Sequence, residues 1–167
     1  ADGIALDGAA EYARQSDHGN NPASFDLDYY RGDAGLSYAG AKLGLGYEVL
    51  EGNNVTGFST PLATLHAFNG WADVFLTTPG TGLEDFFVSA GYGMSDVLGL
   101  KKLSGAVVYH DFEAETSGAS LGDEWDAVLK AEMNDHLALT AKYATYDGPT
   151  GGPADRDKVW FQVDFSY

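Results

Sequence analysis

The chain has 167 residues, the size of one domain, and its 25 acidic against 9 basic residues give a net charge of -16. So acidic a chain excludes a nucleic-acid-binding module, because too few cations are present to neutralise phosphates. The absence of cysteine excludes a disulfide scaffold and thiolate chemistry, and no apolar run reaches the roughly 18 residues of a membrane-spanning helix.

About eight segments alternate apolar and polar residues with a period of two, which is typical of strands with one apolar and one polar face. In chain order we predict strands over residues 4–15, 24–31, 39–49, 85–93, 103–112, 125–132, 137–146 and 158–167. None of these segments has the spacing of an amphipathic helix. The sequence therefore predicts an all-β protein.

The connections between these strands alternate long and short. Long connections are predicted at residues 16–23, 52–84, 113–123 and 147–157, and tight turns at residues 32–37, 94–102 and 133–136. Outer-membrane barrels have this asymmetry, with short periplasmic turns and longer outside loops. We therefore predict one domain over residues 1–167, an antiparallel up-and-down transmembrane β-barrel with a long outside loop at 52–84 and both termini on the short-turn side.

A soluble up-and-down barrel of the lipocalin kind has a similar number of strands but an apolar interior. Two features favour the membrane barrel over it. Charged residues occupy the polar faces, and we predict that they face a lumen: Lys42, Glu48, Asp126, Lys130, Glu132 and Lys142. Aromatic residues such as Tyr47, Trp125 and Tyr143 lie near strand ends on the apolar faces, where the headgroup region of a bilayer favours them.

The last strand resembles the recognition signal of outer-membrane proteins, in which alternating hydrophobic residues precede an aromatic last residue. The residues that carry this resemblance are Val159, Phe161, Val163, Phe165 and Tyr167. We therefore expect them to act as the membrane-insertion signal.

The chain also resembles the alginate-export-like outer-membrane porin family, over nearly its whole length. The matching segments are EYARQ (11–15), GYEVLEG (46–52), GFSTPLATLHAFNGWAD (57–73), FLTTP (75–79), GLED (82–85), VYHDF (108–112), EWD (124–126) and KYA (142–144), of which 60–73 is the most specific. They correspond to the C-terminal portion of the family's larger barrel. The resemblance implies a porin-like transport channel in the outer membrane of a Gram-negative bacterium.

Two sizes of barrel stay open at this point. About eight strands close into a barrel filled by side chains, whereas about 16–18 strands leave an aqueous channel. The favoured function is a passive channel for small solutes or ions, and the alternative is a small non-conducting barrel that anchors its outside loops for structure or adhesion. An oligomer, or a missing N-terminal part of a larger barrel, also stays open, and membrane lipid and lipopolysaccharide are the expected surroundings.

The charge balance favours cations or neutral solutes over a polyanion, which needs a basic lumen. Acidic residues crowd the predicted loop end of the barrel: Asp17, Glu51, Glu84, Glu113, Glu115, Asp123, Asp147 and Asp155. Because a channel mouth with a net negative charge concentrates cations, the sequence predicts a preference for cations.

The predicted loop at 52–84 is too long for a plain hairpin connection and too apolar to extend into water. We predict that it folds into the channel mouth as a constriction, with Thr60, His66, Phe68, Trp71 and Asp73 as its residues. The alternative is a cap that packs on itself or on a neighbouring subunit.

Catalytic, cofactor and metal sites are not expected. His110 and Asp111 are adjacent on a strand, so their side chains point to opposite faces. His66 has no serine and acid at the spacing of a nucleophile site. Asp26 and Asp28 read as an ordinary polar strand face, without the glycine and terminal glutamate of a calcium loop.

Overall fold

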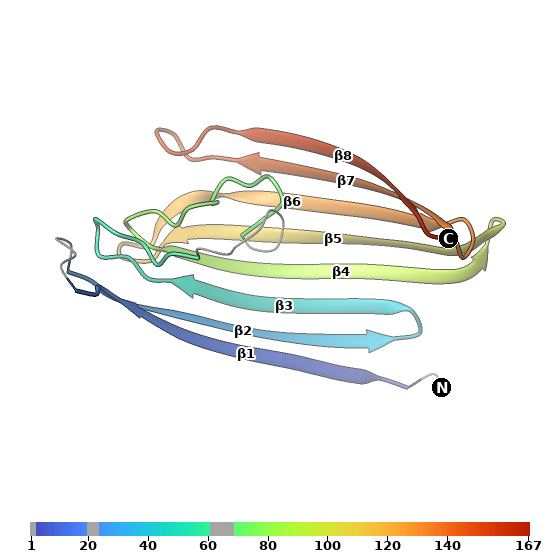
Figure 1. Cartoon of the computed structure of the whole chain (residues 1–167), viewed down its shortest axis with the longest axis horizontal. Helices are drawn as coiled ribbons and strands as arrows, with labels where there is room; N and C mark the ends of the chain where they lie inside the picture. The colour runs from blue at the N-terminus through green and yellow to red at the C-terminus, as the bar shows by residue number, and fades with distance from the viewer. Residues whose placement is uncertain (1–2, 20–23, 61–68) are drawn as a thin grey trace.

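A computed structural model describes residues 3–19, 24–60 and 69–167, so the predicted residues His66 and Phe68 lie outside the described ranges. Eight antiparallel strands form one sheet and follow one another in chain order (Figure 1). They are β1 (Ala5–Ser16), β2 (Asp26–Tyr38), β3 (Ala41–Leu50), β4 (Leu83–Val97), β5 (Leu100–Ala114), β6 (Ala119–Glu132), β7 (Leu137–Asp147) and β8 (Arg156–Phe165). No helix able to cross a membrane is found in these residues.

The predicted all-β, up-and-down arrangement of eight strands is confirmed, because each strand pairs with its neighbours in sequence. The sheet is open. Among the described residues nothing pairs with the free edge of β1 or of β8. Both ends of the chain lie at the end of the sheet that carries the tight turns (Figure 1).

Three of the predicted connections have the wrong bounds, and one of them, the turn expected at 94–102, is only residues 98–99, because β4 ends at Val97 and β5 begins at Leu100. Residues 32–37 were expected to form a turn, but β2 continues to Tyr38, and the chain reverses at Ala39 and Gly40, whose positive φ values of 46° and 85° match a two-residue type I′ hairpin. The long connection expected at 113–123 is a four-residue turn, because β5 ends at Ala114 and β6 begins at Ala119. Gly118 allows this turn with a φ of 64°.

The long connection between β3 and β4 spans residues 51–82, and its described residues pack against one face of the sheet, which we call the inner face. It is slightly shorter than predicted, because Leu83 and Glu84 pair with the end of β3. We call the opposite surface the outer face, and apolar residues on it are exposed along the strands. The most exposed in the middle of the sheet are Leu43, Leu45, Leu129, Val159 and Phe161.

The apolar core lies between the 51–82 connection and the loop end of the inner face. The ring of Phe75 packs against those of Phe112 and Tyr146, with centroids 4.8 and 6.0 Å apart. Phe58, from the same connection, stacks on Tyr29 at 5.6 Å. Burial against the sheet therefore explains why Phe58 and Phe75 are apolar.

Gly46 on β3 makes room for an aromatic ring on the inner face. A Cβ atom at this position would lie 2.2 Å from the Phe87 ring, and the guanidinium of Arg31 stacks on that ring at 5.2 Å. Gly46→Ala is expected to destabilise the protein by about 1–3 kcal/mol, because the ring must move. Denaturant unfolding in detergent measures the loss, with Gly32→Ala as the control, since a Cβ at Gly32 meets open space. Equal stability of the two variants would contradict the prediction.

Candidate functional site

Residues 69–73 of the long connection, which we call the 69–73 segment, are hydrogen-bonded to the inner face of β6. The backbone N–H of Trp71 donates to the carboxylate of Asp126 at 3.1 Å. The next backbone N–H, that of Ala72, donates to the carboxylate of Glu124 at 2.6 Å. Two carboxylates of one strand therefore fix two successive peptide groups of the segment.

A second set of contacts ties the segment to β8. The guanidinium of Arg156 donates to the carbonyl oxygens of Ala72 and Asp73, at 3.2 and 2.7 Å. The ammonium of Lys158 donates to the carboxylate of Asp73 at 2.5 Å. The segment thus spans the inner face from β6 to β8, with its N–H groups toward carboxylates and its carbonyl oxygens toward a cation.

A buried polar row continues from the segment across β3, β4 and β5. Glu48 accepts hydrogen bonds from the Tyr29 hydroxyl at 2.8 Å and the Asn69 amide at 3.1 Å. Asp85 lies opposite Glu48 in the β3–β4 register, and its two carboxylate oxygens are 2.9 and 3.0 Å from Nδ1 of His110. Nε2 of the same histidine lies 3.7 Å from Asp126. The carboxylates therefore form one connected band over β3 to β6.

Acidic and basic residues of this band lie over different strands. The carboxylates lie on β3, β4 and β6, with His110 between them on β5, and cations flank the band: Arg31 on β2, Lys142 on β7, and Arg156 and Lys158 on β8. The ammonium of Lys142 lies 5.1 Å from the centre of the Trp71 ring. The carboxylates of the band are almost fully buried, and on β2 Arg31 is paired with Asp33 at 3.0 Å, so these charges act mainly on one another and on the segment.

Two of the hollows on the inner face differ in the charge of their lining. A small one of about 170 Å³ borders the segment and is lined by Arg31, Glu48, Trp71, Asp85 and His110 among others. A larger one of about 540 Å³ lies toward the tight turns, and its charged lining is Lys42, Lys102 and Lys130. The charged lining of the small hollow is therefore mainly acidic, and that of the larger one is basic.

All six residues predicted to face a lumen lie on the inner face, but they do not form one cluster. Glu48 and Asp126 belong to the buried band, and Lys142 contacts Trp71 beside it. The other three lie toward the tight turns: Lys42, Lys130 and Glu132, the last two forming an ion pair at 3.7 Å.

The predicted constriction residues are only partly described. Trp71 and Asp73 belong to the segment on the inner face. Thr60 is half-buried in the same connection, before the residues that the structure leaves undescribed. The proposed insertion-signal residues lie on the outer face of β8, from Val159 to Phe165, with Tyr167 exposed beyond its end.

His110 and Asp111 point to opposite faces, as their spacing predicts. His110 is buried on the inner face, whereas Asp111 is exposed on the outer face. The contact between His110 and Asp85 was not predicted, because it depends on the register of β4 and β5. Among the described residues no group of three or more His, Asp or Glu side chains is arranged to hold a metal ion.

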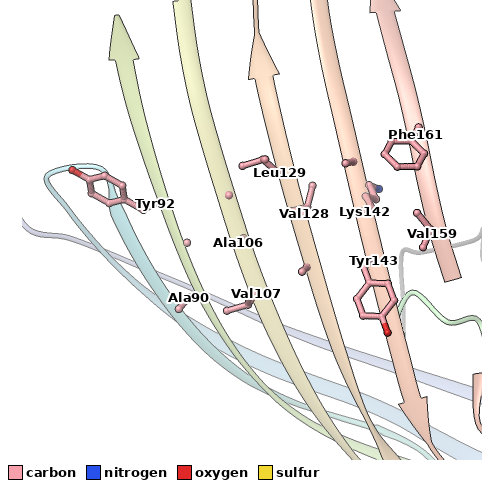
Figure 2. A pocket seen from close by; sticks show the side chains of 14 residues that line it. Ala90, Tyr92, Ala106, Val107, Val128, Leu129, Lys142, Tyr143, Val159 and Phe161 are labelled. Carbon is pink, nitrogen blue, oxygen red and sulfur yellow. The ribbon is translucent and has the colours of Figure 1, made fainter. Parts of the chain in front are cut away.

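A shallow hollow of about 700 Å³ lies on the outer face over β4 to β8. Small residues, such as Ala90 and Gly105, form its floor between larger ones. Figure 2 shows the larger side chains around it: Tyr92, Val107, Leu129, Tyr143, Val159 and Phe161. The hollow therefore offers an uneven apolar surface.

Comparison of the chain with protein-family models, with curated proteins and with solved structures gives no match in any of the three. Function is therefore inferred from the two faces of the sheet and from the segment that crosses the inner one.

Proposed function

We propose that the sheet is the wall of an outer-membrane β-barrel that acts as a porin-like passive channel for small cations or neutral solutes. The observation that carries this proposal is the contrast between the two faces. Apolar side chains are exposed along the outer face from β1 to β8, with Phe161 83% exposed, whereas charged groups line the inner face. A soluble barrel buries apolar residues inside and exposes polar ones. The apolar residues of this sheet are on the outer face instead, which supports contact of that face with lipid.

Two rows of aromatic residues border the apolar part of the outer face and support this orientation. The row at the loop end is Tyr12, Tyr30, Tyr47, Phe86, Tyr109, Trp125 and Tyr143. Tyr38, Tyr92 and Phe165 lie near the tight turns. On β2, Tyr38 comes eight positions after Tyr30, which is about 26 Å along a strand. This distance is close to the roughly 25 Å height of the apolar band of known barrels.

Three tyrosines of the loop-end row direct their hydroxyls away from the apolar band. Tyr12 donates to Asp28 at 3.0 Å, and Tyr143 donates to Asp157 at 2.9 Å. Tyr47 donates to Glu84 at 2.6 Å. An apolar ring with a polar tip on the water side is the arrangement that a membrane interface favours.

Closure of the barrel is part of the proposal. Hydrocarbon offers no hydrogen bonds, so the free edges of β1 and β8 need partner strands. In a meander with an even number of strands, the first and last strands run in opposite directions, so β1 and β8 could pair directly as antiparallel neighbours. An even number of further strands between β1 and β8 would also close the barrel. With eight strands the interior would be filled, whereas a larger number would leave a channel that the 69–73 segment narrows. The resemblance to alginate-export-like porins stays a prediction.

Planar-bilayer recording tests the channel, and we expect steady single-channel conductance with a preference for cations. The carboxylates at the loop end attract cations, and this effect weakens as salt shortens the roughly 10 Å screening length at 0.1 M. The reversal potential in a KCl gradient measures the preference. A gel shift that appears only on boiling verifies that the protein is folded. Silence from folded protein would support the non-conducting anchor, and anion preference at low salt would contradict the predicted selectivity.

A further inference from the structure

Two carboxyl groups that hold the 69–73 segment also contact each other. Glu124 and Asp126 lie two residues apart on the inner face of β6, and their side chains interact. They are 0% and 1% exposed. Each uses one oxygen to accept a backbone N–H of the segment, from Ala72 and Trp71 respectively. The second oxygen of each, Oε2 of Glu124 and Oδ1 of Asp126, is buried without a hydrogen-bond partner.

This arrangement is costly if both groups are ionised. A buried acceptor without a partner costs free energy, and so do two like charges side by side in a dry site. A carboxylic acid differs from a carboxylate by one O–H donor. One proton between the two groups therefore gives both free oxygens a partner and removes one of the two charges.

We propose that Glu124 and Asp126 bind one proton between them, and that this shared proton latches the 69–73 segment onto the inner face. Protonation is favoured in the latched arrangement, so the latch strengthens as the pH falls and weakens as it rises. Loss of the proton leaves two adjacent carboxylates, and movement of the segment away from them lets water solvate both charges and screen their repulsion. The proposal adds a pH-controlled step to the proposed channel but does not require ion flow.

The other ionisable groups around the pair already have partners. Glu48 on β3 accepts a hydrogen bond from Asn69, and Asp85 on β4 contacts His110. His110 approaches Asp126 at Oδ2, the oxygen that accepts the Trp71 N–H, and leaves Oδ1 free.

The groups on the segment, β7 and β8 are also engaged elsewhere. Tyr146 donates its hydroxyl to the carbonyl oxygen of Leu121. Arg156 binds carbonyl oxygens of the segment, and Lys158 binds Asp73. Lys142 lies against the Trp71 ring. A proton is therefore the simplest partner for the two free oxygens.

The absence of cysteine from the chain makes the latch testable by thiol labelling of the full-length protein in detergent. Ala72→Cys places a thiol at a site that is 0% exposed while the segment is latched. Val55→Cys, in the same connection and 83% exposed, corrects for the pH dependence of the reagent. The labelling ratio of the two should rise about tenfold or more between about pH 5 and about pH 9, since one proton gives at most tenfold per pH unit.

Two amide variants, made in both cysteine backgrounds, separate the latch from other titrations. Glu124→Gln keeps an oxygen for Ala72 and gives Asp126 a permanent N–H donor, so the ratio should stay low at every pH. Asp126→Asn should keep an oxygen for the Trp71 N–H and give Glu124 a permanent N–H donor, so the ratio should again stay low at every pH. This variant tests the shared proton independently if Glu124→Gln does not fold. A flat ratio in the parent protein, an unchanged pH response in a folded amide variant, or a response abolished by EDTA would overturn the shared proton.

Discussion

Replacing Leu129 with arginine is expected to remove about 2–4 kcal/mol of stability in a lipid bilayer, the usual cost of a charge on the lipid face near the midplane. Leu129 lies on the outer face of β6 and is 54% exposed. Its neighbour Val128 points to the inner face and borders the larger hollow there. Val128→Arg is therefore a matched control, with an expected loss below about 1 kcal/mol, because its charge reaches water.

Urea unfolding in lipid vesicles, followed by tryptophan fluorescence, measures both losses under the same conditions. The two variants differ only in which face receives the arginine. Equal losses would contradict the membrane assignment, and so would a greater loss at Val128. The second result would support a barrel with its apolar face turned inward.

Removing the cations that hold the segment from β8 is expected to open the channel and weaken the fold. Arg156→Ala deletes two hydrogen bonds to backbone carbonyls, and Lys158→Ala deletes one to a buried carboxylate. Hydrogen bonds to charged groups contribute about 1.5–3 kcal/mol, which is the expected loss for each variant. Conductance should rise in both, because the segment is held by fewer contacts.

Lys101→Ala is the control for these two variants. The Lys101 ammonium pairs with Asp135 at the turn end of the sheet, where both side chains are exposed, and it holds the pKa of that carboxyl below its usual value. An exposed ion pair of this kind contributes little to stability, so neither stability nor conductance should change measurably. An unchanged conductance in folded Arg156→Ala and Lys158→Ala would show that the segment does not limit ion flow.

The strands and their two faces could be predicted from the sequence, because alternation with period two is a local property. The bounds of some turns were predicted wrongly because glycine is also found within strands. Gly32 and Gly35 suggested a turn, but both continue β2, and the reversal occurs at Gly40. The partners of the two edge strands could not be predicted either, because the alternation of residues within a strand does not reveal what pairs with β1 or β8.

The candidate site could be predicted only in part. Glu48 and Asp126 followed from the face that they occupy, and Trp71 and Asp73 from their place in the long connection. The contact between Asp85 and His110 depends on how two strands align, which one sequence does not give. Glu124 was missed because the predicted strand begins at residue 125, although Glu124 lies two residues before Asp126 and therefore on the same face of β6.

The meander also sets the order in which the chain assembles. Six of the seven strand pairings close over short connections, and only β3 with β4 must bridge residues 51–82. That span is four times as long as the 148–155 connection, so its closure costs about 1.2 kcal/mol more in chain entropy. The pairing of β3 with β4 should therefore form last, and its formation should set the rate of folding.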